Sequence, residues 1–432
     1  CAEMSSDWGN ATDLVCTSCE RRYAPGEAVY TCPSCGLDGI LDIQYDYDAV
    51  RHLLTREHLA AHPDPSHWRY LPLLPVAREA ARPLLPVGWT PVHEVAPLAR
   101  YFGLRTVYVK DEGRNPTGSL KDRASSVGAV RAAQAGRREI TCASTGNAAS
   151  SLAGQSAQLG LHPYIFLPAQ ASQSKLAQML IYGATVFKVR GTYEDAFRIS
   201  MEAAARWGWY NRNSAVNPVL VEGKKTAGLE IAEQLGWDPP DAVVVPVGDG
   251  CTLAGIYKGL HEMQRIGLTS RTPRVIGVQA AGASPIEQAF RSGQSLHPGP
   301  SQTIADGIAV GTPRNWRKAL RAVRDSGGTY VTVSDEEILE AMRLLAQRTG
   351  IWGEPAAVAG VAALAHLLER GAISRSERVL LMITGTGLKD IPSTLRASGS
   401  AFEIDASLDA VADMIAKRDA PTPSPAAERT TR

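Results

Sequence analysis

The sequence has almost no net charge, few aromatic residues and no long apolar run. Its 432 residues include 45 Lys and Arg against 44 Asp and Glu, which gives a formal net charge of +1 at pH 7. A near-neutral chain has no broad attraction to phosphate backbones or anionic lipid, so nucleic acid and membranes are disfavoured as main partners. The apolar runs are shorter than the ~20 residues that span a bilayer, and the first ten residues lack the features of a secretory signal. We therefore expect a cytoplasmic protein that acts on a small molecule.

Cysteine is scarce, and four of the seven cysteines form two close pairs. Cys16 and Cys19, like Cys32 and Cys35, are separated by two residues, and twelve residues lie between the pairs. In a reducing cytosol such pairs indicate a metal site rather than disulfides, and four thiolates complete the tetrahedral coordination of a structural zinc ion. We predict a zinc ribbon over residues 1–40, a segment too poor in apolar residues to form a core of its own.

The rest of the chain is long enough for more than one domain, since roughly 150 residues per domain predict about three structural units. Residues 41–85 hold several prolines and are predicted to form an irregular, helix-poor lead-in. From about residue 100, short β-rich runs alternate with amphipathic stretches, which is typical of an α/β fold with mostly parallel sheets. Strands are predicted over 105–109, 139–143, 164–167, 185–189, 242–247, 275–279 and 379–384. Helices are predicted over 122–135, 148–159, 174–182, 193–207, 226–235, 253–266, 336–349 and 357–368. The tail, residues 406–432, is expected to be disordered because its composition cannot support packing.

One loop leads directly into a predicted helix and carries a lysine. It reads Asn115-Pro-Thr-Gly-Ser-Leu-Lys-Asp-Arg123. Lys121 lies near the positive end of the helix, where the macrodipole and any desolvation lower the pKa of its amine and favour the neutral, nucleophilic form. Taken alone, the same residues also describe a solvated lysine in the first turn of a helix.

Three further loops follow predicted strands. Ser144–Ala148 presents hydroxyls and free N–H groups that suit a carboxylate, although helix capping would use the same residues. Val247–Thr252 is glycine-containing and opens a helix, so it can enclose a phosphate, but it matches neither a Walker loop nor the full dinucleotide fingerprint. Ile383–Asp390 places a hydroxyl at the end of an apolar strand, where it can contact a ring nitrogen or form a plain turn.

Taken in order, the four loops strongly resemble those of threonine synthase and its relatives among the pyridoxal-phosphate enzymes of the tryptophan-synthase-β fold. The likeness covers roughly residues 85–395 and includes the segments Gly88–Val92, Asn217-Pro218, Glu222–Thr226 and Trp316–Ala319. It implies a fold-type-II enzyme with two domains and the cofactor between them. The larger, cofactor-binding domain would comprise residues 86–124 and 221–405, and a smaller domain, residues 125–220, would be inserted into it.

The resemblance also implies a role for individual residues. Lys121 would form the Schiff base with the aldehyde of pyridoxal 5'-phosphate, Asn147 would bind the ring hydroxyl, and Thr384 would face the pyridine nitrogen. The cofactor phosphate would be held by Gly248, Asp249, Gly250, Cys251 and Thr252. The substrate α-carboxylate would be held by Ser144, Thr145, Gly146, Asn147 and Ala148. Arg198 and Asn217 match positions that contact the substrate phosphate in this family, and Ser214 and Lys175 lie in the matching segments nearby.

The implied reaction converts O-phosphohomoserine and water to threonine and phosphate, with the amine of Lys121 as base and acid once it is released. A hydroxyl at Thr384, unlike an aspartate, does not keep the ring nitrogen protonated, which disfavours transamination. The sequence departs from the family at Thr192, where an asparagine is common, and at Thr386, where a histidine is frequent. The stretch Thr303–Val310 is more similar to threonine dehydratase.

These departures leave two alternative activities open, a cysteate-synthase-like replacement on phosphoserine and a dehydratase-type elimination from threonine or serine. A catalytically inert regulatory or binding protein is the alternative from a different class. The sequence is compatible with a homo-oligomer and does not define one.

Overall fold

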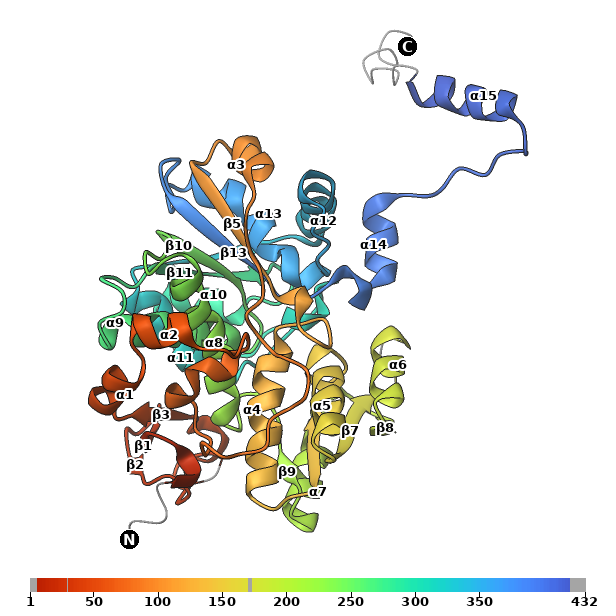
Figure 1. The fold of residues 1–432 in the computed structure, drawn as a ribbon. Helices are drawn as coiled ribbons and strands as arrows, with labels where there is room; N and C mark the ends of the chain where they lie inside the picture. The colour runs from red at the N-terminus through yellow and green to blue at the C-terminus, as the bar shows by residue number, and fades with distance from the viewer. Residues whose placement is uncertain (1–5, 29, 170–172, 420–432) are drawn as a thin grey trace.

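A computed structural model describes residues 6–28, 30–169 and 173–419. Figure 1 shows two layered α/β units side by side, with a small N-terminal unit, drawn in red, beside the helices α8 and α9. In the described ranges the strands form three sheets, of six, four and three strands. Within the described ranges, no helix is long and apolar enough to cross a membrane. The α/β class expected from the sequence is confirmed.

The six-stranded sheet has the order β12-β11-β10-β13-β5-β4, and only the edge strand β4 runs antiparallel. Along β10, Ala242 and Val244 pack into one core cluster, whereas Val243 and Val245 pack into another. This alternation places helices on both faces of the sheet, as expected of a buried parallel strand. The strands are β4 (Val92–Glu94), β5 (Thr106–Asp111), β10 (Ala242–Pro246), β11 (Arg274–Ala280), β12 (Tyr330–Val333) and β13 (Arg378–Ile383).

Helices α3, α12 and α13 share a core cluster on one face of this sheet, and α8, α9, α10 and α11 share the cluster on the other. Their bounds are α3 (Ala96–Phe102), α8 (Val219–Gln234), α9 (Cys251–Arg265), α10 (Pro285–Ser292), α11 (Trp316–Asp325), α12 (Asp335–Thr349), α13 (Pro355–Glu369) and α14 (Ile391–Ser398). Short 3₁₀ turns lie at η4 (Glu112–Arg114), η5 (Asp306–Ile308) and η6 (Gly387–Lys389).

The four-stranded sheet, with the order β8-β7-β6-β9, is parallel throughout. Helices α4, α5 and α6 contribute to the core on one face, and α7 contributes to the core on the other. The elements are α4 (Lys121–Gln134), β6 (Glu139–Ala143), α5 (Asn147–Gln158), β7 (His162–Pro168), α6 (Gln173–Ile181), β8 (Thr185–Val189), α7 (Tyr193–Trp207) and β9 (Tyr210–Asn211). All four strands lie between residues 139 and 211, whereas the large sheet takes strands from before and after this segment. The exact domain bounds, 86–124 with 221–405 and 125–220, stay a prediction.

The expected strands and helices of the α/β region are present, with ends that differ by a few residues, except that α8 begins seven residues before the expected start. The expectation of an irregular segment at 41–85 is wrong for residues 41–73, whereas residues 74–85 contain no helix or strand. Residues 41–45 form β3 (Leu41–Tyr45), which completes an antiparallel sheet with β1 (Ala11–Cys16) and β2 (Arg22–Tyr23). The helices α1 (Tyr47–Leu53) and α2 (Arg56–Ala61) and the 3₁₀ segment η3 (His67–Leu73) follow. The side chains of Asp46 and Thr55 cap the N-termini of α1 and α2. These two residue types at helix starts are the signal in the sequence from which the helices could have been predicted.

The C-terminal segment also differs from the expectation. Leu408–Asp419 forms the helix α15, which Figure 1 shows apart from the body of the molecule, and residues 420–432 lie outside the described ranges. Leu408, Val411 and Ile415 recur at helical spacing. The expectation of disorder rested on the composition of the whole tail and did not take this periodicity into account. All three side chains are exposed.

The backbone of α8 is in direct contact with the backbones of α4 and α9 where it crosses them. A Cβ at Gly223 of α8 would overlap the backbone carbonyl of Arg123 in α4, and one at Gly259 of α9 would overlap the backbone carbonyl of Lys225 in α8. The guanidinium of Arg123 then joins the two helices, with its Nε 2.7 Å from Glu112 and its Nη1 2.6 Å from Glu230, all fully buried. Since Lys121 begins α4, this contact fixes the position of the lysine relative to α8.

We expect Gly223→Ala to destabilise the protein. The added methyl group has no room against the Arg123 carbonyl, and overpacking of this kind costs about 1–3 kcal/mol. The check is the denaturant midpoint of unfolding. Gly299→Ala is the matched control, because a Cβ at Gly299 meets nothing within 4 Å. Equal midpoints for the two variants would show that α4 and α8 separate without cost.

Candidate functional site

The carboxyl ends of strands from both larger sheets open onto one pocket of about 320 Å³. Lys121 lies on its wall, with the loop Ser144–Ala148 after β6, the loop Gly248–Thr252 after β10, and Thr384 after β13. The structure thus brings together the four loops that the sequence singled out. The volume lies at the lower end of the range usual for small-molecule sites.

Lys121 stands at the first position of α4, held by the end of β13. The backbone N–H of Leu120 donates to the carbonyl of Thr384 over 2.9 Å, and Ser119 forms a bridge to Gly385. Burial, aided by the nearby ammonium group of Lys224, lowers the pKa of the Lys121 amine to about 8. A substantial fraction of the amine is therefore neutral near pH 8, which a nucleophilic lysine requires.

The glycine loop places backbone N–H groups at the start of α9. Gly250 precedes the helix with φ of 89°, and a Cβ there would lie 2.7 Å from the Cβ of Ala319. Asp249 is an acidic residue within this anion loop, and it is hydrogen-bonded to the turn before α11. Its side chain accepts from the backbone N–H of Arg314 over 3.1 Å, and its backbone carbonyl accepts from the backbone N–H of Asn315. The loop and the helix start can therefore hold a phosphate through backbone donors.

Asn147, at the start of α5, is paired with a carboxylate that the sequence analysis did not single out. Its side-chain amide donates to Glu354, the residue that precedes α13. The side-chain oxygen of Asn147 and one oxygen of Glu354 are buried without a hydrogen-bond partner among the described residues. Burial raises the pKa of Glu354 above its usual value. Unpaired buried polar atoms on a pocket wall are expected where a polar ligand completes the hydrogen bonding.

Besides Lys121, three cations of the described residues line the pocket, and sequence reasoning assigned a role to none of these three. Arg212 and Lys224 are almost fully buried, and Arg314 lies over the ring of Phe197 at 3.9 Å. In the described part of the chain none of the three forms an ion pair. Arg212 instead donates to Ser125 and Ser214. Burial lowers the pKa of Lys224, so an anion nearby would stabilise its charge.

The expectation that Arg198 faces the pocket is not met by the structure. Its side chain is 58% exposed and pairs with Glu202 at 3.0 Å and Asp195 at 3.7 Å on its own helix. Tyr193 and Glu194, one turn earlier in α7, do line the pocket, so the helix is near but this side chain turns outward. A motif match locates a helix in the fold but does not determine which side chain of that helix faces the ligand.

Of the other three residues expected near the substrate phosphate, one lines the pocket and two do not. Ser214 lines the pocket. Asn217 is fully buried outside the lining and donates to the carbonyl of Asn211 over 2.9 Å. Lys175 is also buried and pairs with Asp306, with one oxygen of Glu354 at 3.9 Å. Asn217 and Lys175 therefore support the loops around the pocket in this structure.

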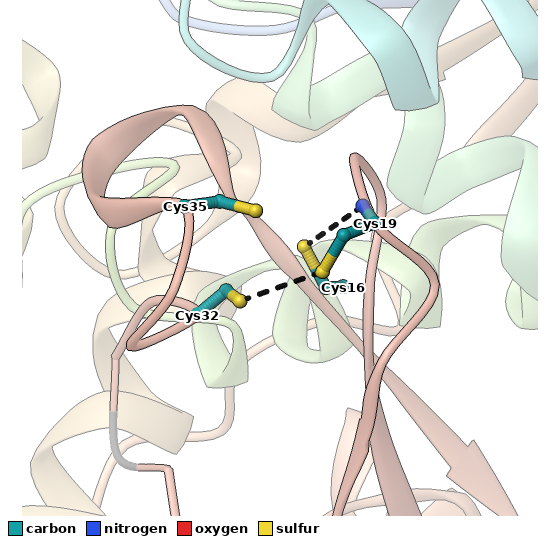
Figure 2. Close-up of side chains that lie close together, drawn as sticks. All are labelled: Cys16, Cys19, Cys32 and Cys35. Carbon is teal, nitrogen blue, oxygen red and sulfur yellow. Dashed lines mark hydrogen bonds between the residues drawn. The ribbon is translucent and has the colours of Figure 1, made fainter.

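The four paired cysteines converge away from this pocket. Figure 2 shows the side chains of Cys16 and Cys19 facing those of Cys32 and Cys35 across two turns. The four sulfur atoms lie within 4.8 Å of one another, and the sulfurs of Cys19 and Cys32 are 3.8 Å apart. Four thiols at these distances suit one tetrahedral ion.

Residues 84–385 match the family model of the pyridoxal-phosphate dependent enzymes. The pocket fits that cofactor, because it combines a lysine of lowered pKa, a backbone anion loop, buried oxygens of Asn147 and Glu354 that accept no hydrogen bond, and cations without carboxylate partners among the described residues. The fold and the site together define a pyridoxal-phosphate-dependent enzyme.

More narrowly, the chain belongs to the threonine synthase family. It is 40% identical to the threonine synthase of Methanosarcina acetivorans over 93% of this chain and 98% of that one. It is 42% identical to the threonine synthase of Methanocaldococcus jannaschii over 90% of this chain and 96% of that one.

Solved structures show the same fold. A threonine deaminase from T.th. superimposes with a TM-score of 0.58 at 27% identity, covering 69% of this chain and 92% of that one. Threonine deaminase isoform 2 from Solanum lycopersicum gives a TM-score of 0.62 at 20% identity, covering 88% of this chain and 98% of that one, and is similar in fold alone.

We expect the lowered pKa of Lys121 to appear in the rate at which the cofactor-free protein binds pyridoxal 5'-phosphate covalently. Because the neutral amine attacks, the rate should rise with pH and level off above about 8, the value to which burial lowers the pKa. An ordinary lysine, with a pKa of ~10.4, would give a rate that still rises at pH 9. The measurement is the growth of visible absorbance after mixing. Lys121→Ala is the control and should develop no such band while keeping its circular dichroism.

Proposed function

We propose that this protein converts O-phosphohomoserine and water to threonine and phosphate. The observation that carries the proposal is the lining of the pocket, which combines Lys121, the backbone loops Ser144–Ala148 and Gly248–Thr252, and three cations that form no ion pair among the described residues, Arg212, Lys224 and Arg314. A substrate that carries both a carboxylate and a phosphate matches this lining. The relatives that cover most of the chain are threonine synthases, which favours this activity over the phosphoserine and dehydratase alternatives.

Bound pyridoxal phosphate supplies the electron sink that makes protons on the substrate carbon chain acidic. The amine of Lys121 is placed to take a proton from Cα and to return protons at later steps, since burial keeps a fraction of it neutral. The N–H groups and hydroxyls of Ser144–Ala148 orient the substrate through its carboxylate. The cations of the pocket lining, Arg212, Lys224 and Arg314, would stabilise the phosphate that leaves from Cγ, before water adds at Cβ.

The proposal assigns cofactor contacts to the loop Gly248–Thr252 for the phosphate, to Asn147 for the ring hydroxyl and to Thr384 for the ring nitrogen. Glu354 holds the Asn147 amide. Because the amide N–H is directed by a fixed carboxylate, the orientation of the Asn147 side chain is determined before any ligand enters.

The direct test is an assay of the purified holoenzyme with O-phosphohomoserine, phosphoserine plus sulfite, threonine and serine. Phosphate release with threonine formation from O-phosphohomoserine supports the proposal. Turnover of phosphoserine or deamination of threonine without this reaction would replace it with one of the alternatives. An absence of visible absorbance and of all turnover would point to an inert protein.

We expect Arg314→Ala to lower kcat/KM for O-phosphohomoserine at least tenfold. A hydrogen bond to a charged group contributes about 1.5–3 kcal/mol, and each ~1.4 kcal/mol is a factor of ten. Arg314→Lys keeps the charge and should recover part of the loss.

Arg198→Ala is the matched comparison on the neighbouring helix. It removes only exposed contacts to Glu202 and Asp195 and no side chain of the pocket lining, so kcat/KM should change by about twofold or less. A larger loss in Arg198→Ala than in Arg314→Ala would restore Arg198 as the contact to the substrate phosphate.

We also propose that Cys16, Cys19, Cys32 and Cys35 bind one structural zinc ion. The proposal is supported by the four sulfurs within 4.8 Å, which two separate turns of the N-terminal unit bring together. Four thiolates leave no open coordination position, so the ion would have no part in the reaction.

Elemental analysis is expected to give about one zinc per chain. The double variant Cys16→Ser with Cys32→Ser should lose the metal, whereas Cys142→Ser, a buried cysteine of β6 outside the cluster, should keep it. Zinc retained by the double variant would refute the assignment.

A further inference from the structure

The cysteine cluster and the glycine loop of the pocket are joined through one apolar side chain. Ile40, which directly precedes β3, packs in a separate buried cluster with Ala215, Val221 and Cys251. Cys251 is the first residue of α9 and part of the anion loop, and Ala215 follows Ser214 of the pocket lining. Ile40 is 3% exposed, so it fills this position completely.

The cysteine cluster itself determines where Ile40 lies. The carbonyl of Gly39 accepts from the N–H of Cys32 over 2.8 Å, and the carbonyl of Ile40 accepts from the N–H of Thr17 over 2.9 Å. Gly39 is enclosed so closely that a Cβ there would lie 2.5 Å from the Cβ of Cys32 and 2.6 Å from that of Cys35. The backbone before Ile40 is therefore held by Cys32 and Cys35, and the carbonyl of Ile40 is held by Thr17, the neighbour of Cys16.

A second contact leads from β3 to the same loop. The carboxylate of Asp42 lies 2.6 Å from the ammonium group of Lys318 and 3.3 Å from that of Lys258. Lys318 also donates to the carbonyl of Leu41 over 3.1 Å. Its neighbour in α11, Ala319, is the side chain that a Cβ at Gly250 would meet, so α11 lies directly against the glycine loop.

The turn before α11 is hydrogen-bonded directly to the glycine loop. The N–H of Asn315 donates to the carbonyl of Asp249 over 3.1 Å, and the N–H of Arg314 donates to the Asp249 side chain. Both neighbours of the glycine loop, the start of α9 and the start of α11, are thus in contact with one short segment of the N-terminal unit.

We propose that Ile40 and Asp42 are positioning residues for cofactor binding: the N-terminal cysteine unit holds the loop Gly248–Thr252 in the conformation that accepts the phosphate of pyridoxal 5'-phosphate. This inference rests on the proposed role of that loop and adds a function to the N-terminal unit. The described lining of the pocket includes neither residue, so each acts only through the loop and its neighbouring helices.

The test is the dissociation constant of pyridoxal 5'-phosphate from the full chain, measured by titrating the cofactor-free protein and following visible absorbance. Ile40→Ala leaves a cavity against Cys251 and should raise the dissociation constant at least fivefold. Ile40→Val removes one methylene group and should raise it less. Asp42→Asn, which acts through Lys318, should also raise it. The phosphorus-31 resonance of the bound cofactor should shift in each variant, because it reports the surroundings of the phosphate.

The control is Arg22→Ala, which removes an exposed ion pair with Asp13 in the same N-terminal sheet, away from α9 and α11. It should bind the cofactor as the wild type does. Unchanged dissociation constants and phosphorus resonances in Ile40→Val and Asp42→Asn, both of which conserve shape, would overturn the inference even if Ile40→Ala failed to fold. A wild type that binds no cofactor would instead refute the proposed function.

Discussion

The contact between α4 and α8 determines the arrangement of the whole pocket. Lys121 begins α4, and Lys224 lies on α8 next to Gly223, whose missing side chain lets the two helix backbones touch. A larger residue at position 223 would move the two lysines apart and weaken the electrostatic effect by which Lys224 lowers the pKa of Lys121. Besides burial, a packing constraint between two helices therefore contributes to the reactivity of the pocket lysine.

The buried charges around Arg123 make that contact specific. The guanidinium is shared between Glu112 and Glu230, and Glu230 also pairs with Lys110 of β5 at 2.7 Å. Buried ion pairs of this kind contribute little net stability, but removal of one member leaves an uncompensated charge, which costs about 3–5 kcal/mol. The arrangement disfavours any register of α4 against α8 and β5 that would separate these side chains.

The sequence was sufficient to predict the pocket loops but not all of its side chains. Lys121, the loop after β6 and the glycine loop are local signals, since a turn at the end of a strand can be recognised from neighbouring residues. Arg314 and Lys224 carry no such signal, because their position depends on how α8 and the turn before α11 pack against other segments. For Arg198 the motif correctly indicated a helix near the pocket, but it did not indicate that this side chain faces solvent. Short elements such as β12, with four residues, lack enough residues for a detectable period.

The order of strands in the large sheet has a consequence for how the chain folds as it is made. β13 lies between β10 and β5, and it pairs residue 378 with residue 106. During synthesis, the antiparallel pair of β4 and β5 must therefore wait, with one edge unpaired, until residue 378 has left the ribosome. The carbonyl that supports the start of α4 belongs to Thr384, so the pocket lysine acquires its surroundings last. Until β13 emerges, the unpaired edge of β5 is open to aggregation, and we expect chaperones to bind nascent chains at this stage.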